Sequence, residues 1–574
     1  MMRKLQHLFP ILDWGSTYST SNFKGDLFAG ITVAFMLIPQ GLAYAMLAGL
    51  PPLYGLYSAF IPGLIYGIMG TSQHLSVGPV ALDSIILASG LNALSIVNSE
   101  NYISTAIFLA LYVGLLQIVL GGLKLGFLIH YISKPVVRGF TYAAALIIGA
   151  SQLPLILGLS ITDISLSSLS LSNDIDFNEF TFLVGVSGVL ILLLLKRITP
   201  GFPNYVLLVV FSTLLSFVFV WEVKGVNVVG DIDRGIPYFT LPSVTSQVFI
   251  ELSPLAITIA LLAFMQSHTV ANFLEDKSNK QFQMRPNQEL IALGTSNLIG
   301  SFFNAYTVSG GLSRSVVNKK SGANTAMSSI VSALFVGMVL VFFTDYFYHL
   351  PEAILGSIIF VAVIQLIDFK YAETLWQKYR SEFYIFLFTF LATLFLGIKY
   401  GVLLGVFVSL THMVYLHSKP HVALLGRIRG TNHFKNISRF SDEVITYPGV
   451  LIVRFDGSLF YGNQVYFKQR IEEHMQAQKE PLRYLLVDAS PLNYIDATAF
   501  DMIVEWISEL REDGKKVLWA QVVGPVRDMF YKNQIINTNE EQVVFSSLDS
   551  ALNYLNGISL NANEEKISNQ VNLN

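Results

Sequence analysis

The sequence predicts a polytopic α-helical membrane protein that ends in an α/β domain. Of 574 residues, 53% are hydrophobic and only 13% are charged, whereas soluble domains carry roughly 25% charged residues. Up to about residue 420, apolar runs such as Thr181–Leu195 alternate with short polar connections. They lack the period of two that a β-barrel requires, so helices remain as the way to cross a bilayer. After residue 420 charges are frequent and no run is long enough to span.

The composition divides the chain into five parts. We expect a cytoplasmic lead-in at 1–24, a membrane domain at 25–418, a basic linker at 419–445, an α/β domain at 446–556 and a disordered polar tail at 557–574. The tail is predicted to be disordered because it has too few apolar residues to bury.

The membrane domain contains about fourteen apolar segments, several of which are interrupted by proline or glycine. The connections 92–104 and 158–178 hold acidic residues but neither lysine nor arginine, whereas those around Lys124, 196–197 and 277–285 are basic. Positive charge favours the cytoplasmic side, and an even number of spans then places both termini there. The interruptions fall at Pro39, Pro51-Pro52, Gly78-Pro79, Pro135, Pro254, Gly310-Gly311 and Pro351.

Two of these interruptions predict helices that begin inside the membrane. They are "SVGPVALDS" (Ser76–Ser84) and "TVSGGLSRSVVN" (Thr307–Asn318), about half of the membrane domain apart. A helix N-terminus has unpaired N–H groups and a partial positive charge, so it attracts anions. Interrupted helices of this kind form the midplane sites of secondary transporters. With Arg314 close behind the second break, the pattern predicts an anion site.

Several classes of function are excluded. The chain has no cysteine and a formal net charge of −3, which excludes thiolate metal sites and argues against a nucleic-acid partner. It has no Walker, HExxH or GxSxG sequence, so neither ATP-driven pumping nor hydrolysis has support. We expect no enzymatic activity, no metal site and no cofactor beyond a coupling ion.

Three stretches resemble the sulfate permease family, the bacterial relatives of animal solute carrier family 26. They are "DLFAGITVAFMLIPQGLAYAMLAGLPPLYGLYSAFIPGLIYGIMGTSQHLSVGPVA" (Asp26–Ala81), "RPNQELIALGTSNLIGSFF" (Arg285–Phe303) and "GGLSRSVVNKKSGANT" (Gly310–Thr325). The resemblance covers nearly the whole chain. It implies fourteen segments in two inverted seven-segment repeats, a core and a gate domain, and an anion held between segments three and ten. It also implies a C-terminal cytoplasmic STAS domain.

The resemblance also implies which residues bind the anion. Gln40 and Tyr44 match pocket-lining positions on the first segment, Val80 begins the third, and Leu312, Ser313 and Arg314 begin the tenth. Gln40 and Ser313 can donate hydrogen bonds, and Arg314 keeps its positive charge. The alternatives are a structural pairing or snorkelling for Arg314, and a helix-packing amide for Gln40.

Asp83 departs from the family pattern, in which an aliphatic residue is usual at this position. A carboxyl that is protonated, or that holds Na⁺, would bind together with the anion, which is the linkage that a symporter needs. Alternatively, Asp83 complements the helix dipole or pairs with Arg314.

The eighth segment contains two further candidates for coupling to an ion. Its sequence "AFMQSH" has Gln266 where proton-coupled relatives carry glutamate, so the usual proton carrier is missing. His268 is a further titratable candidate, although a packed histidine is the commoner case. Glu289 fits the family pattern, and we expect it to be structural.

The C-terminal part alternates strands and helices, which predicts a sheet covered by helices. "LLVDASPLNYIDATAF" (Leu485–Phe500) resembles the strand–loop–helix signature of anti-sigma-factor antagonists, with Thr498 at the phosphorylated position and Asp496 retained. Phosphorylation is chemically possible there, but Asp496 and Thr498 as simple helix caps are the favoured interpretation. The domain is expected to support dimerisation, trafficking or binding of a cytoplasmic protein.

The sequence therefore predicts a secondary active transporter of a small inorganic oxyanion, with sulfate the first choice, coupled to H⁺ or Na⁺ by an elevator-type movement. Bicarbonate or dicarboxylate transport, anion exchange, an uncoupled anion channel and a membrane-anchored sensor are the alternatives. The expected setting is a homodimer in the lipid bilayer of the inner (plasma) membrane.

Overall fold

The computed structural model describes residues 8–94, 99–127, 133–159, 177–198, 204–242, 246–275, 284–533 and 543–556. The tail at 557–574, predicted to be disordered, lies outside the described residues, as do most of the connections at 158–178 and 277–285. The chain forms two compact units, Met1–Ser409 and Leu410–Asn574, and each is described by itself.

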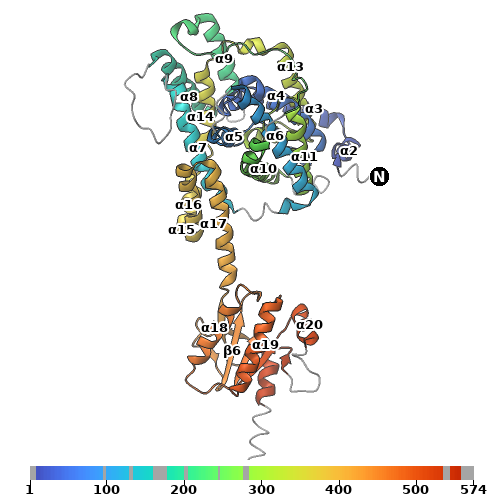
Figure 1. Ribbon diagram of the computed structural model, residues 1–574, viewed down its shortest axis with the longest axis vertical. Coiled ribbons are helices and arrows are strands. Elements are labelled where there is room, and N and C mark those ends of the chain that lie inside the picture. The colour runs from blue at the N-terminus through green and yellow to red at the C-terminus, as the bar shows by residue number, and fades with distance from the viewer. Residues whose placement is uncertain are drawn as a thin grey trace, which may run out of the picture. The chain divides into compact units, whose positions relative to one another are not determined.

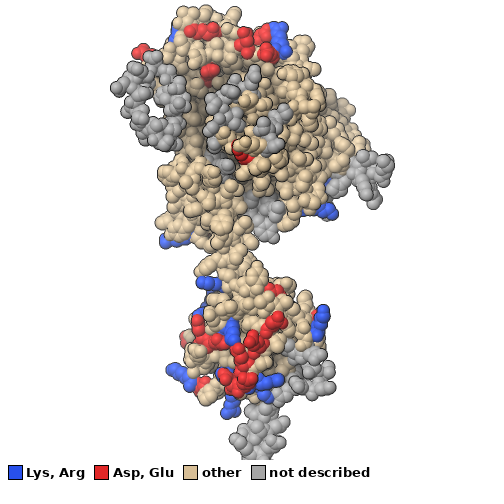
Figure 2. All heavy atoms as spheres, viewed as in Figure 1, with Lys and Arg blue, Asp and Glu red and all other residues tan. Residues whose placement is uncertain are grey.

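The first unit is helical (Figure 1). Six of the described helices are long and apolar enough to cross a membrane, and on the face in Figure 2 charged side chains gather at two rims with few between. This is a multi-pass membrane unit. Its helices are α2 (Ile11–Gly15), α3 (Thr20–Leu47), α4 (Pro52–Met69), α5 (Ala81–Ala93), α6 (Ser99–Gly122), α7 (Lys134–Leu157), α8 (Glu179–Ile198), α9 (Asn204–Phe219), α10 (Ser246–Leu274), α11 (Pro286–Ser301), α12 (Leu312–Lys320), α13 (Met327–Phe342), α14 (Glu352–Ile364), α15 (Phe369–Lys378), α16 (Arg380–Leu396) and α17 (Ile398–Ser418), with 3₁₀ turns at Trp221–Lys224 and Thr344–Phe347.

Glycines let the helices of this unit approach closely. A Cβ built on Gly114 of α6 would lie 2.6 Å from the carbonyl oxygen of Gly294 in α11, and one on Gly294 would lie 2.7 Å from that of Gly114. Small residues at such crossings bring two membrane helices into backbone contact. The packing of α6 against α11 therefore depends on both glycines.

The two predicted helix breaks are confirmed. Two short strands, β1 (Val77–Gly78) and β2 (Ser309–Gly310), pair antiparallel, with Val77 opposite Gly310 and Gly78 opposite Ser309. Soon after each strand a short helix begins, α5 after β1 and α12 after β2. This equivalence supports the expectation of two inverted repeats, which, like the count of fourteen segments, stays a prediction.

The second unit is an α/β sandwich. Its strands and helices are β3 (Val422–Ile428), β4 (Phe434–Asn436), β5 (Val444–Ile445), β6 (Val450–Phe455), α18 (Gln464–Gln476), β7 (Tyr484–Asp488), α19 (Ala497–Glu512), β8 (Lys516–Ala520), α20 (Gly524–Lys532) and β9 (Val544–Phe545). The sheet order is β4-β3-β6-β7-β8-β9, with β5 also paired to β3 and with β6 to β9 parallel.

Alternating side chains of the sheet enter two cores. Leu451 and Val453 of β6 pack with residues of α18, α19 and α20, whereas Ile452 packs on the other face with Leu548 and Leu552 from the helical segment 548–556. This arrangement confirms the predicted sheet covered by helices.

The prediction of a linker at 419–445 is wrong from residue 422 onward, because β3, β4 and β5 belong to the sheet. Residues Val422–Ile428 form β3, which pairs antiparallel with β6 and buries Ala423 and Leu425. The strand was missed because the basic stretch "GRIRG" suggested a linker. The charges of this stretch lie at the end of β3, and the apolar residues that precede the stretch enter the sheet.

Candidate functional site

The candidate site is built around the paired strands β1 and β2, which hold the N-termini of α5 and α12 together. Gly311 N donates to Ser76 O at 3.0 Å beside the strand pair. The Ser315 hydroxyl accepts from Ser76 N at 2.9 Å and donates to Gly311 O at 2.7 Å. Each helix thus begins at a fixed point, with first-turn N–H groups that no earlier turn can bond.

Arg314 is buried at this point, with 1% of its surface exposed. Its Nη1 donates to Pro79 O at 2.9 Å and to Gln40 Oε1 at 3.2 Å. Its Nε and Nη2 have no hydrogen-bond partner among the described residues, and no carboxylate there forms an ion pair with it. These two N–H groups lie side by side on one edge of the guanidinium and suit two oxygens of one anion.

Glycine makes room for this guanidinium. A Cβ on Gly311 would lie 2.8 Å from both Cζ and Nη2 of Arg314, whereas one on Gly78 would lie at an ordinary 3.5 Å from Nη2. A side chain at position 311 would therefore require the guanidinium to shift from its place against the start of its own helix.

The structure brings most of the predicted binding residues together. Gln40 holds Arg314 directly, and the buried Tyr44 lies within electrostatic range of the guanidinium, as does Tyr306. Val80 follows Pro79 and precedes the first residue of α5. Leu312 and Ser313, in the first turn of α12, are exposed. Their roles as anion ligands stay predictions.

Asp83 lies in the first turn of α5 and is completely buried. It forms no ion pair with Arg314, which excludes the pairing alternative. Ser309 lies close to Asp83. Even so, neither carboxylate oxygen of Asp83 has a well-formed hydrogen bond among the described residues, and nor does the hydroxyl of Ser309. The carboxyl therefore remains a candidate for holding H⁺ or Na⁺, with the helix dipole as the competing explanation.

Of the two candidates on α10, Gln266 contacts the strand pair. Its Nε2 donates to Gly310 O at 3.3 Å. His268 bonds Asn272 through Nε2 at 2.8 Å, and its ring packs 5.6 Å from that of Phe264. These two contacts lie within α10, and the role of His268 in coupling stays a prediction.

Three residues around the strands were missed in the sequence. Ser267 accepts from Gly310 N at 2.8 Å. Asn297 of α11 accepts from Val308 N at 2.8 Å and donates to Val308 O at 3.2 Å. Tyr306 lies 3.3 Å from the Ser84 hydroxyl. The available signal was a polar residue in an apolar helix, which applies to both Asn297 and Ser267.

Glu289 is a structural residue, as expected. Its carboxylate accepts from Tyr66 Oη at 2.8 Å, from Thr71 N at 2.6 Å and from Ser72 N at 3.1 Å. It therefore ties α11 to the end of α4 and to the segment that leads into β1.

In the second unit, Asp496 is the N-cap of α19. Its Oδ1 accepts from Ala499 N at 2.8 Å and its Oδ2 from Tyr461 N at 2.9 Å. Thr498 is exposed in the first turn, where Asp496 already supplies the cap. The capping interpretation thus holds for Asp496, and phosphorylation of Thr498 stays a prediction.

Comparison with known proteins agrees with these observations. A family model described as "Sulfate permease family" matches residues 23–389, and a STAS domain model matches residues 443–551. The chain is 36% identical to "Sulfate transporter 4.1, chloroplastic" of Arabidopsis thaliana, over 88% of this chain and 76% of that protein. It is 30% identical to "High affinity sulfate transporter 2" of Stylosanthes hamata, over 96% and 86%.

Two solved structures share the fold. The murine Solute Carrier 26 family member A9 anion transporter, in the inward-facing state, matches with a TM-score of 0.88 and 24% identity, over 97% of this chain and 95% of that one. The transmembrane domain of the cyanobacterial bicarbonate transporter BicA matches with a TM-score of 0.57 and 23% identity, over 69% and 98%.

Proposed function

The chain belongs to the sulfate permease family and is an anion transporter, not an enzyme, and from this premise we propose that it is a secondary active transporter of sulfate. Its curated relatives are named as sulfate transporters. The membrane unit supplies the site and the STAS domain is an accessory to it.

One observation carries the proposal: a buried arginine that has no counter-ion among the residues that the structure describes. An unpaired charge out of water is costly, and Arg314 uses only Nη1 for the protein. A tetrahedral oxyanion can accept from Nε and Nη2 together and from the free N–H groups of the two helix starts. A bound anion would therefore remove a cost that the empty site bears.

The second part of the proposal concerns coupling. Anion and cation bind together when each removes unfavourable charge for the other. Asp83 is buried beside the same strand pair that positions Arg314, and it forms no ion pair within the described part of the chain. We assign it the coupling role, holding H⁺ or Na⁺ while the anion is bound.

The remaining parts of the proposal follow the family. The core domain moves against the gate domain in an elevator-type cycle, the protein is a homodimer of the plasma membrane, and both termini are cytoplasmic. The connections that are basic in the sequence support this orientation.

The test is uptake of radiolabelled sulfate into proteoliposomes under an imposed pH or Na⁺ gradient. Wild type should accumulate sulfate with one of the two gradients, and Asp83→Asn should bind sulfate but lose the gradient dependence. Uptake that ignores both gradients in wild type would contradict coupling and indicate a channel. If sulfate is not taken up but bicarbonate or a dicarboxylate is, sulfate is the wrong substrate.

A further inference from the structure

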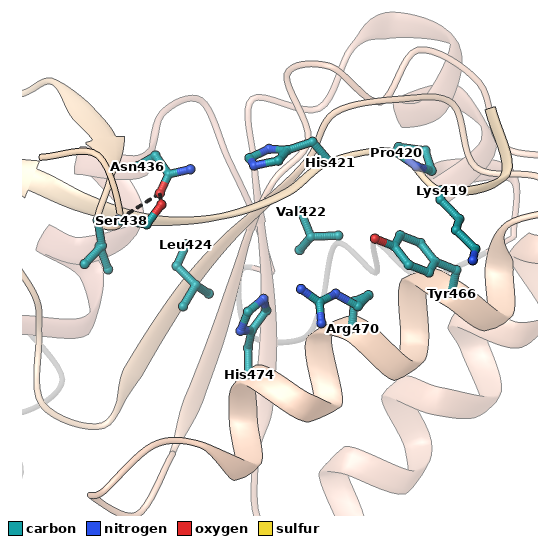
Figure 3. Close-up of a pocket in the computed structure, with 11 residues that line it drawn as sticks. Lys419, Pro420, His421, Val422, Leu424, Asn436, Ser438, Tyr466, Arg470 and His474 are labelled. Carbon is teal, nitrogen blue, oxygen red and sulfur yellow. Dashed lines mark hydrogen bonds between the residues drawn. The ribbon is translucent and has the colours of Figure 1, made fainter. Parts of the chain in front are cut away.

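The STAS domain has a hollow of about 580 Å³ that has no role in the proposed transport. It lies between β3 and α18. Tyr466, Arg470 and His474 are four residues apart on α18 and therefore share one face, and Figure 3 shows them pointing into the hollow. Val422 and Leu424, which alternate along β3, line it with apolar side chains.

The charged side chains that line the hollow are cations, and its other polar side chains can donate hydrogen bonds. The other polar lining residues come from the segment before β3, which contributes Lys419 and His421, and from the segment at the end of β4, which contributes Asn436 and Ser438. Asn436 Oδ1 accepts from Ser438 N at 2.9 Å, which fixes the side of the amide. Among the described residues that line the hollow, none is Asp or Glu. Its chemistry therefore suits an anion.

Nearby carboxylates compensate only part of this charge. His421 Nδ1 lies 3.2 Å from Asp456 Oδ2, but Arg454 also pairs with Asp456. Arg470 pairs with Glu473, which is exposed and does not line the hollow. Lys419 lies 4.9 Å from the ring centre of Tyr415, a contact with no negative charge.

His474 adds an unused polar atom. Its Nε2 is buried and has no hydrogen-bond partner among the described residues. Burial and the Arg470 guanidinium lower the pKa of His474. An anion in the hollow would give Nε2 a hydrogen-bond partner and would offset the repulsion between Arg470 and a protonated His474.

The size of the hollow and its apolar side indicate more than a bare ion. Pockets for small organic ligands have about 300–1,000 Å³, and here Val422, Leu424 and the Tyr466 ring could contact an organic group while Arg470 binds the charge. We propose that this hollow binds a phosphate monoester, with Arg470 and His474 on the phosphate. The monoester is either a soluble metabolite or the headgroup of a lipid, and the inference is independent of the transported anion.

The test uses the full chain in detergent, with two probes. Calorimetry with AMP measures binding of a soluble monoester. Native mass spectrometry with added phosphatidic acid measures retention of a lipid monoester, and phosphatidylcholine, a diester, is the comparison lipid. We expect one of the monoesters to bind and Arg470→Gln to weaken binding by about tenfold or more, the equivalent of about 1.4 kcal/mol. His474→Gln should weaken it less.

Matched variants distinguish binding in this hollow from binding at arginines elsewhere in the chain. Arg511→Gln changes an exposed arginine of α19 outside the hollow, and Arg314→Gln removes the arginine of the membrane site. Both should bind the monoester as wild type does. Failure of AMP and of phosphatidic acid to bind, or equal binding by wild type and by a folded Arg470→Gln protein, would overturn the inference. Loss of binding in Arg314→Gln alone would assign the ligand to the transport site instead.

Discussion

At the scale of single residues, the proposed anion site depends on one edge of the Arg314 guanidinium. Arg314 is held by Pro79 O and Gln40 through Nη1, which leaves Nε and Nη2 without partners in the described ranges of the chain. Arginine, Gln40 and the Gly-Gly break could all be recognised in the sequence. The sequence could not show which nitrogen atoms of Arg314 stay unpaired, because that depends on its rotamer and on its contact with the backbone of a distant segment.

Gly311 is the residue that permits this rotamer. We expect Gly311→Ala to displace the guanidinium, because the new Cβ would lie 2.8 Å from Arg314 Cζ. Sulfate affinity should fall by about tenfold or more, since a charge-assisted hydrogen bond contributes about 1.5–3 kcal/mol. Equilibrium binding of radiolabelled sulfate to the purified protein measures this.

Gly122→Ala is the control, because a Cβ there would meet nothing within 4 Å. It should bind sulfate normally. Unchanged affinity in Gly311→Ala would show that the fold-back of Arg314 is not needed for the anion.

At the scale of elements, the site exists because two strands pair where two helices begin. The breaks before α5 and α12 could be predicted from Gly-Pro and Gly-Gly. Their pairing could not, since β1 and β2 are two residues each and too short to show any alternation. For the same reason, Ser267 and Asn297, which bond the backbone of the segment 308–310, were not found from the sequence.

Ser315 tests how much this pairing matters. Ser315→Ala removes the acceptor of Ser76 N, and leaving a buried N–H unsatisfied costs about 1–3 kcal/mol. We expect a lower unfolding temperature and weaker sulfate binding, measured by thermal unfolding with and without sulfate.

Ser332→Ala in α13 is the matched change, because the Ser332 hydroxyl is buried without a partner among the described residues. Its stability and affinity should stay close to those of wild type. Equal behaviour of the two variants would show that the Ser315 bonds do not fix the strands.

At the scale of the whole molecule, the chain combines two units that each have their own cores. The membrane character of the first unit and the α/β order of the second follow from composition and periodicity. The start of the second sheet was misplaced, because β3 pairs with β6, a contact between segments that no local pattern in the sequence reveals.

The second unit should lose stability in mild acid. The pKa of His474 is lowered by burial and by Arg470, so below the ordinary value of 6.5 the unfolded chain binds a proton more readily than the folded one. Stability then falls as the pH decreases below about 6.5, and His474→Gln should reduce the slope.

Thermal unfolding of the full chain, followed by tryptophan fluorescence between about pH 7.5 and 5.5, spans the histidine titration. Trp506 and Trp519 are buried in this unit. The exposed His433→Gln provides the control and should keep the slope of wild type. An unchanged slope in His474→Gln would contradict the assignment.

The most direct test of the account is equilibrium binding of radiolabelled sulfate to wild type, Arg314→Lys and Arg314→Gln. Arginine offers two adjacent donors, lysine keeps only the charge, and glutamine keeps neither. We therefore predict that affinity decreases in that order and that Arg314→Gln shows no measurable binding while remaining folded. Wild-type affinity in Arg314→Gln would contradict the claim that the anion binds at this arginine.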